Sequence, residues 1–397
     1  MDTITHGIAG ALIAKAVFRG QGLLAPHPMN RGRIITWSLM LGAVFPDSDV
    51  FRDIFSRDPL LVITWHRSIT HSLVMLPLWV LLLAAVTRAF ANSRKWEAPS
   101  FAVLTAIYAV GILSHILLDL VTSFGTMIWS PLAWSRPAWD LVFIVDFTLT
   151  AIFLLPQLLA WVYSRPERVK PRAAGMGLVF LPAPWLIARI GQAVGAPISD
   201  KLVLSAMLIL AALFLLPVLR GWGLKIGPAN WNRAGFAAAL FYAACTVYAH
   251  HAAYARIQKF AELGHLQVES IGALPLPPSL WHWDGLIRTD RGVYELRMDL
   301  SDKAASDTEL LTREHHYYPN AYPNSYIDAA RRLPEVERVL WFARFPVTYF
   351  HKESDVAVVE ISDIRFAQTR RDRPAPFTYR VRFGPGGRVL SQGWVKR

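Results

Sequence analysis

Long apolar segments dominate the first 255 residues of the chain and limit the folds that it can adopt. A helix that crosses the hydrocarbon core of a bilayer needs about 20 mostly apolar residues, with a range of about 17–25. Two shorter apolar segments, 4–18 and 34–46, are expected to be tilted spans, re-entrant hairpin arms or helices packed inside the bundle. The sequence therefore predicts an α-helical polytopic membrane bundle of about eight segments. The six segments of full length are 72–90, 101–119, 141–163, 176–194, 202–219 and 234–254.

The composition fits a membrane protein and argues against a nucleic-acid-binding one. Hydrophobic residues make up 53% of the chain and charged residues 18%, below the quarter that is typical of soluble domains. The formal net charge is +12, but residues 1–263 hold 22 Lys/Arg against 12 Asp/Glu, so +10 of it lies in the membrane part. Positive-inside topology explains basic residues in short loops better than binding to nucleic acid does. The single cysteine, Cys245, excludes a disulfide framework and a thiolate zinc site.

The basic residues lie mostly on one face of the predicted bundle if all eight segments cross. Fourteen fall on one face and five on the other, so the richer face is expected to be cytoplasmic. The N-terminus and the C-terminal region are then extracytoplasmic. No basic region precedes the first apolar segment, so this segment is expected to stay as a helix and not to be cleaved as a signal peptide. The fourteen are Lys15, Arg19, Arg31, Arg33, Arg88, Arg94, Lys95, Arg165, Arg168, Lys170, Arg172, Arg220, Lys225 and Arg233; the five are Arg52, Arg57, Arg67, Arg136 and Lys201.

The hydropathy pattern of the sequence changes after residue 263. The Pro-rich stretch 273–283 ends the membrane region, and residues 326–345 contain a helix that Pro334 interrupts. Residues 264–397 are therefore expected to form an extracytoplasmic α+β domain, mostly strand, beside a transmembrane domain over residues 1–263. Alternating apolar and polar residues predict strands in the segments 292–300, 354–361 and 377–383. A hairpin turn is expected over 383–389.

Histidines and aspartates gather at the ends of the apolar segments that are predicted to face the extracytoplasmic side. Successive helices run in opposite directions, yet these residues come out at one level, whereas random placement would scatter them over both faces. Placing ionisable groups at a membrane boundary is costly, and such residues are functional by default. We interpret the cluster as a metal site, with the candidate ligands His6, Asp47, Asp49, His66, His71, His115, Asp119 and Asp146.

The donor types and their spacing suit a transition metal ion. His115 and Asp119 are four residues apart, so they project from the same face of a helix. Imidazole and carboxylate without thiolate favour zinc, with manganese or iron as alternatives. Roughly three to five ligands serve one ion, so the cluster supplies two ions, or one ion and residues that orient its ligands. The structural alternative makes Asp47, Asp49 and Asp146 helix caps and each histidine a solvated side chain.

Three residues of the cluster region are candidates for catalysis. Asp47 or Asp49 is expected to serve as a ligand or a general base. Arg67 lies between two candidate ligands, where its guanidinium could hold a phosphate or carboxylate, although an ion pair with one of the aspartates is an equal alternative. The motifs GxxxxGK[ST], HExxH and GxSxG are absent, so ATP use, zincin proteolysis and serine-esterase chemistry are unsupported.

Four spaced motifs carry a resemblance to a known family. In order, MDTITHGIAGALIAK, FPDSD, HRSITHSLV and SHILLDLVTSFGTMIWSPLAW resemble the bacterial membrane-bound metal-dependent hydrolases, also described as LexA-binding, inner membrane-associated, YdjM-like proteins. The resemblance covers roughly residues 1–160, and the tail segments PLPPSLWHW and DIRF match less strongly. It implies a metal-dependent hydrolase in the inner membrane of a bacterium. By motif it points to His6, Asp47, Asp49, His66, His71, His115 and Asp119, with Asp146 at its margin.

Three functions of different classes follow. The favoured one is a membrane-embedded hydrolase that acts at the extracytoplasmic surface on a lipid phosphate or another anionic amphiphile. The cluster at head-group depth, Arg67, and the interfacial tryptophans Trp129, Trp134 and Trp139 motivate that substrate class. The alternative is a non-catalytic membrane regulator that binds a partner through its C-terminal domain. A transporter is less favoured, because the charges lie at helix ends rather than at the bilayer midplane.

Overall fold

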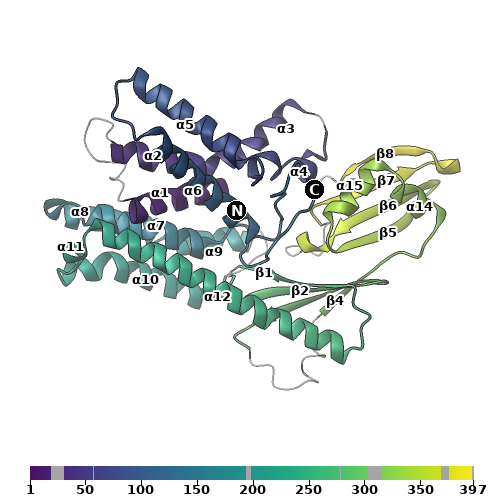
Figure 1. Ribbon diagram of the computed structural model, residues 1–397. Coiled ribbons are helices and arrows are strands. Elements are labelled where there is room, and N and C mark those ends of the chain that lie inside the picture. The colour runs from purple at the N-terminus through teal and green to yellow at the C-terminus, as the bar shows by residue number, and fades with distance from the viewer. Residues whose placement is uncertain are drawn as a thin grey trace.

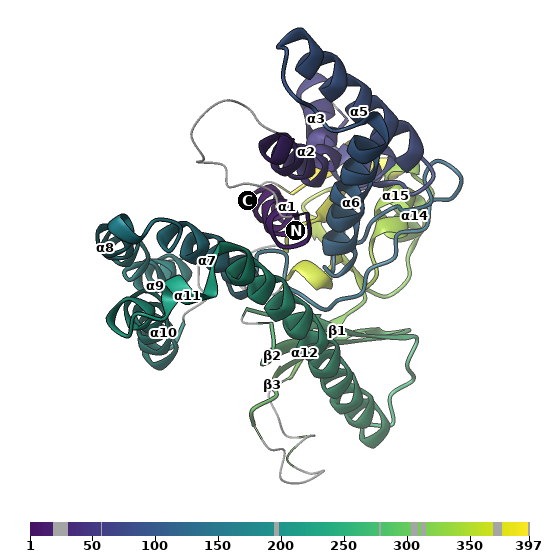
Figure 2. The same cartoon turned by 60° about the vertical axis from the view of Figure 1, so that its left-hand side comes forward.

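The computed structural model describes residues 1–18, 31–56, 58–193, 198–277, 279–302, 309, 311, 315–367 and 375–395. Helices run through the described chain up to Leu263, and two antiparallel sheets follow, as the sequence predicts. The long helix α12 (Pro228–Leu263) begins among the other helices and ends against the first sheet (Figure 1). The same arrangement is visible after rotation, with the α7–α11 helices at one end of α12 and strands β1–β3 at the other (Figure 2).

The first helical group holds α2 close against α1 and α6. A Cβ at Gly111 would lie 2.8 Å from the carbonyl oxygen of Leu39 and 3.0 Å from the backbone of Gly42. Small residues of this kind let the backbones of membrane helices approach closely. The end of α2 is thereby held beside the middle of α6. The group contains α1 (Thr3–Val17), α2 (Arg31–Val44), η1 (Phe45–Val50), α3 (Phe51–Phe55), α4 (Leu61–Thr64), η2 (Ile69–His71), α5 (Leu76–Ser93) and α6 (Phe101–Leu120).

The second helical group differs from the predicted segments at three points. The segment expected over 234–254 lies within the longer helix α12, which is not among the described helices that are long and apolar enough to cross a membrane. The segment expected over 176–194 is divided between α8 and α9, with Pro182 in the turn between them, where its missing N–H does not weaken a helix. The segment expected from residue 141 begins as a helix only at Phe147, because Asp146 caps it. This group contains α7 (Phe147–Val162), η3 (Pro166–Arg168), α8 (Val169–Phe180), α9 (Ala183–Ala193), α10 (Asp200–Leu219), α11 (Gly223–Ile226) and α12.

Several helices are suited to a bilayer. Among the described residues, α5, α6 and α10 are long and apolar enough to cross a membrane. A fourth candidate is α7 together with Pro166–Arg189, two parts bent by 108°, and α1 is a shorter apolar helix. Leu204 and Leu208 on α10 are more than half exposed, an apolar outer surface that lipid would cover. These features support a membrane location, but they do not confirm a count of eight crossing segments.

The C-terminal region consists of two four-stranded antiparallel sheets, with strand orders β1-β2-β3-β4 and β5-β6-β7-β8. The predicted strands coincide with β3, β6 and β7, and the predicted turn contains Gly386 and Gly387 at φ angles of 77° and 79°. Pro334 separates the two helices α14 and α15, because it begins the second of them. The elements are β1 (Ser270–Pro275), β2 (His282–Thr289), β3 (Gly292–Asp299), β4 (His315–Pro319), α14 (Ser325–Arg331), α15 (Pro334–Phe342), β5 (Pro346–Glu353), β6 (Val356–Asp363), η4 (Ile364–Phe366), β7 (Thr378–Phe383), η5 (Pro385–Gly387) and β8 (Val389–Trp394).

The helical and sheet regions share their buried apolar cores. One core joins Ile63 and Phe124 of the helical region to Phe342 of the second sheet's layer. Another joins Ile257 of α12 to Trp283 of the first sheet. The loops that follow η1 and α6 therefore lie between the helices and the C-terminal domain, and both regions determine their shape.

Candidate metal centre

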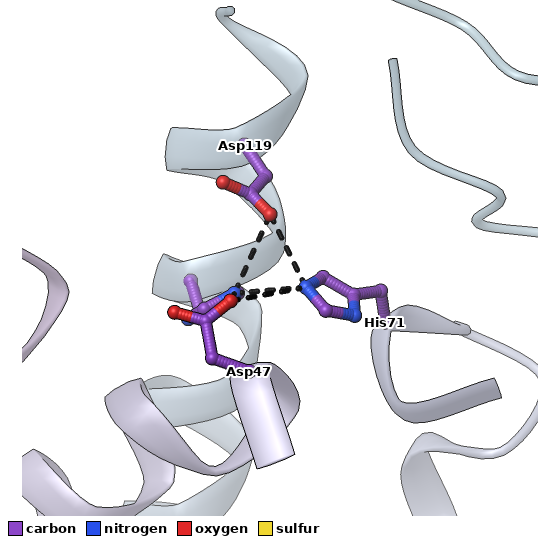
Figure 3. Close-up of side chains that lie close together, drawn as sticks. Asp47, His71 and Asp119 are labelled. Atoms are coloured by element: carbon purple, nitrogen blue, oxygen red, sulfur yellow. Dashed lines mark hydrogen bonds and ion pairs between the residues drawn. The ribbon is translucent and has the colours of Figure 1, made fainter. Parts of the chain in front are cut away.

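Four of the predicted ligands meet at one point inside the helical region. One donor atom each from Asp47, His71, His115 and Asp119 lies within 4.8 Å of all the others. The Nε2 atom of His71 is 3.2 Å from Asp119 Oδ2 and 3.8 Å from Asp47 Oδ1. The Nε2 atom of His115 is 3.4 Å from each of the same two oxygens. Figure 3 shows Asp47, His71 and Asp119 pointing toward one another from three separate elements.

Local structure explains how these side chains converge. His115 and Asp119 project from the same face of α6, one turn apart. Asp47 lies in the 3-10 helix η1 that follows α2, and Pro46 occupies the start of that short helix. The chain reaches His71 through Arg67, whose φ of 62° is a left-handed conformation that is costly for a residue with a side chain. The close packing of α2 on α6 then brings Asp47 to His115.

The two histidines face each other through their Nε2 atoms. His115 Nδ1 lies 2.7 Å from the carbonyl oxygen of Ala43, which can only accept, so this nitrogen carries the proton. His71 Nδ1 faces a carboxylate oxygen of Asp49 at 3.4 Å, which favours a proton there too. The two Nε2 atoms are only 3.0 Å apart. Two lone pairs at this distance repel each other unless a proton or a metal ion lies between them.

Three observations indicate that the four donors suit a metal ion. A tetrahedral ion with bonds of about 2.0–2.1 Å separates its ligand atoms by about 3.3 Å. Five of the separations between these donors run from 3.0 Å to 3.8 Å. Asp119 Oδ2 is buried and accepts no hydrogen bond from the described residues, although Arg67 Nε lies 2.9 Å from it. Carboxylate and imidazole donors suit zinc, manganese and iron without distinguishing among them.

Two of the remaining candidates surround the group without joining it. His6 stacks on His115 with ring centroids 3.7 Å apart, and its Nε2 lies 3.2 Å from Asp119 Oδ1. Asp49 accepts from the backbone N–H of Arg67 at 2.8 Å and lies close to His71 Nδ1. Both residues are placed where they orient ligands, which is how partners around a metal site usually act.

His66 and Asp146 lie further from the four donors. His66 Nδ1 is 3.0 Å from Asp49 Oδ1, and its side chain is 24% exposed, whereas those of His71 and His115 are fully buried. Asp146 caps α7 through the N–H groups of Thr148 and Leu149, which is the structural alternative that the sequence left open. Its other oxygen accepts from Tyr242 at 2.6 Å.

The charges around the centre balance its carboxylates. Arg67 is 2% exposed and pairs with Asp119, so the ion-pair alternative describes its contacts, and its use as a substrate clamp stays a prediction. The α-amino group of Met1 also pairs with Asp119. Burial would raise the pKa of Asp47, but hydrogen bonds with His115, His71 and Thr3 hold that pKa below its ordinary value.

Sequence reasoning missed several supporting residues. Thr3 donates to Asp47 Oδ2 at 2.5 Å, and Thr122 accepts from Arg67 at 3.0 Å. Arg136 donates to the carbonyl oxygens of His66 and Gly125 at 2.9 Å and 3.2 Å, and burial lowers its pKa to about 9. Thr3 and Thr122 do lie in the motifs that contain the ligands, so their proximity in sequence was a usable signal. No local pattern marks Arg136.

The fold and the site together describe a protein with several helices suited to a membrane and a two-histidine, two-aspartate group at the ends of its helices. Residues 1–192 match the model of the family described as YdjM inner membrane protein, which confirms the resemblance found in the sequence motifs. The match contains all four donors and ends before α10. No curated protein and no solved structure matches the chain.

Proposed function

We propose that the protein is a membrane-bound, metal-dependent hydrolase whose metal is held by His71, His115 and Asp119, with Asp47 as the acid–base residue. The observation that carries this proposal is the pair of imidazole nitrogens facing each other at 3.0 Å, beside two carboxylates. A catalytic site keeps one metal position open for water. Asp47 is the candidate for the base, because its Oδ1 lies 3.8 Å from His71 Nε2, whereas Asp119 Oδ2 lies 3.2 Å from the same nitrogen.

A divalent ion bound here would lower the pKa of water to about 7 and polarise a phosphoryl or acyl oxygen. The residues of this chain prepare that chemistry. Ala43 fixes the proton of His115 on Nδ1, and Arg67 neutralises part of the charge of Asp119.

The proposed substrate is an amphiphile with an anionic head group, such as a lipid phosphate. A cleft of about 730 Å³ lies between the loop after η1 and helix α15 of the C-terminal domain. Arg52 and Arg338 line it with three tryptophans, one of which, Trp65, directly precedes His66. Arg52 lies over the Trp65 ring at 3.7 Å. Cationic and aromatic side chains together suit a phosphate that is attached to an apolar chain.

Exposed apolar residues beside this cleft support action at the membrane surface. Phe55, Leu132 and Trp134 are 87%, 79% and 64% exposed, and Trp134 also lines the cleft. Large exposed apolar side chains of this kind suit the boundary of a bilayer. We place this face, with the C-terminal domain, outside the cytoplasm on the basis of the fourteen-to-five distribution of basic residues.

Metal analysis and lipid-phosphate turnover test the proposal on detergent-purified protein. We expect about one bound ion per chain and hydrolysis of a lipid phosphate in mixed micelles that a chelator abolishes. His71→Ala should lose both the metal and the activity, whereas Asp47→Asn should keep most of the metal and lose the activity. The matched control is His351→Ala, because His351 is 45% exposed on β5, far along the chain from the centre.

Each possible outcome tests a different part of the proposal: the metal site, the hydrolase activity or the amphiphilic substrate. Equal metal content in His71→Ala and His351→Ala would reject the site. Bound metal with no turnover of lipid or soluble esters would favour the alternative, a non-catalytic regulator. Turnover of water-soluble esters alone would reject the amphiphile and leave the hydrolase.

A further inference from the structure

We propose that the C-terminal domain positions the metal centre, and that Arg365 is the residue through which it acts. This inference rests on the proposed metal site, but not on hydrolysis. The loop 121–146 begins directly after Asp119 on α6, and the C-terminal domain contacts it at several points. The domain is thus placed to fix the orientation of a ligand that lies outside it.

Arg365 makes three hydrogen bonds in three directions. Its Nε donates to Asp363 Oδ2 at 2.8 Å, and its Nη2 donates to the carbonyl oxygen of Phe342 at 2.8 Å, both within the C-terminal domain. Its Nη1 donates to the carbonyl oxygen of Ser123 at 2.9 Å, four residues after Asp119. The guanidinium is 3% exposed, so these bonds form out of water. The planar guanidinium spreads its donors over three nitrogens that point in different directions, whereas a lysine ammonium offers its donors from a single nitrogen.

The next residue, Phe124, continues the connection to the centre. On one side its ring lies 5.3 Å from Phe342 and 6.0 Å from Phe377 of the C-terminal domain. On the other side it lies 5.7 Å from the His66 ring and 5.1 Å from the guanidinium of Arg67. Arg67 holds Asp119, so a shift of Phe124 would reach the ligand through one intervening side chain.

Further contacts hold the same loop along its length. Arg344 of the C-terminal domain forms a bidentate pair with Asp140, at 2.9 Å and 2.8 Å. Trp341 donates to the carbonyl oxygen of Trp134 at 3.1 Å. Gly125 has a φ of 86°, and a Cβ there would lie 2.9 Å from the Arg136 carbonyl oxygen, so the turn beside Arg365's contact is also tightly constrained. The loop is held at its start, middle and end.

Two variants of the Arg365 pair test the proposal in the full-length protein. Arg365→Lys keeps a positive charge beside Asp363 but loses the fork. The double variant Asp363→Asn with Arg365→Met removes the buried pair together, so that no buried carboxylate is left alone. The matched control is Arg380→Lys, because Arg380 pairs with Glu360 on the face of the second sheet and is 38% exposed.

The measurements are the affinity for Co²⁺ by chelator competition, its visible absorption spectrum, and hydrogen exchange over residues 121–142. Both Arg365 variants should bind Co²⁺ about tenfold more weakly, the loss typical when a partner of a ligand is removed. Their Co²⁺ spectra should change and residues 121–142 should exchange faster, while Arg380→Lys matches the wild type. An interface that only stabilises the fold would lower thermal stability without changing the Co²⁺ spectrum.

Wild-type affinity, spectrum and exchange in a folded Arg365 variant would overturn the proposal. If the wild type binds no Co²⁺, the proposed metal site fails, and hydrogen exchange alone decides whether Arg365 holds the loop. If Co²⁺ binds but no substrate turns over, the hydrolase proposal fails and the positioning role is still measured. Loss of the fold in both Arg365 variants would also overturn it, because Arg365 would then be required for folding rather than for positioning.

Discussion

Replacing Gly111 with alanine should weaken the metal centre, although Gly111 supplies no side chain to it. A Cβ at residue 111 would lie 2.8 Å from the Leu39 carbonyl oxygen and 3.0 Å from the Cα and carbonyl carbon of Gly42. All three are backbone atoms, so no side chain can turn away. The helix α2 has to move from α6, and α2 leads directly into the 3-10 helix that carries Asp47.

The magnitude follows from two opposing terms. Alanine is favoured over glycine in a helix by about 1 kcal/mol. Relieving contacts this short against backbone costs about 1–3 kcal/mol, so the net loss of stability is about 0–2 kcal/mol. A displacement of about 0.5 Å would also stretch the 2.7 Å bond from His115 Nδ1 to Ala43, which is next to Gly42. Removing such a partner of a metal ligand weakens binding by about tenfold.

The comparison with Gly175→Ala makes the test specific. Gly175 lies in α8, and a Cβ there would meet nothing within 4 Å, so the substitution should be neutral or stabilising. Thermal unfolding in detergent and Co²⁺ competition would be measured on both variants. Equal unfolding midpoints and equal affinities would refute the argument that the approach of α2 to α6 sets the geometry of the site.

Three other outcomes are expected. Asp146→Ala should lose about 2–4 kcal/mol of stability, because a helix cap and a buried hydrogen bond from Tyr242 are removed. The variant should keep its metal content, and loss of the metal in a folded variant would show that Asp146 is a ligand. Burial opposes ionisation of Asp49, but contacts with His66, His71 and Arg67 hold its pKa below the ordinary 3.8. The stabilisation that ionised Asp49 provides should therefore be complete above about pH 4 and fall at lower pH. The difference in unfolding midpoint between the wild type and Asp49→Asn should then become smaller on acidification. A difference that does not change with pH would contradict the lowered pKa. Cysteine labelling should place residues near 225 in the cytoplasm and residues near 300 outside, and the reverse result would mean that segments 4–18 and 34–46 do not both cross.

Local patterns predicted the elements of this fold well, because hydropathy and turn residues act over a few positions. The segments expected over 101–119 and 202–219 coincide with α6 (Phe101–Leu120) and α10 (Asp200–Leu219). The bend of 108° after α7 lies next to the charged stretch 165–172, where the sequence places a loop between two segments. Whether the two parts cross as one broken span or as two segments depends on packing, which a local pattern does not reveal. For the same reason the number of crossing segments could not be derived from length alone.

The candidate site was only partly predictable. The four-residue spacing of His115 and Asp119 is local and gave their shared face correctly. The sequence could not separate the four donors from His66 and Asp146, because that distinction depends on how α2, η2 and α6 pack. The contacts of Arg136, and the contact of Arg365 with Ser123, could not be predicted because the acceptors are backbone carbonyl oxygens, which form no pattern in a sequence.

The continuous helix α12 has a practical consequence for dividing the protein. The last turns of α12 pack against the first sheet through Ala253, Ile257 and Phe260, which are at most 4% exposed. Gly285 of β2 approaches so closely that a Cβ there would lie 2.6 Å from Ile257. A truncation after Leu263 would leave this apolar stripe bare on one fragment and remove the base of the sheet from the other. A cut at residue 263, where the composition of the sequence changes, would therefore yield two fragments prone to aggregation. A C-terminal domain meant for separate study needs the end of α12 attached.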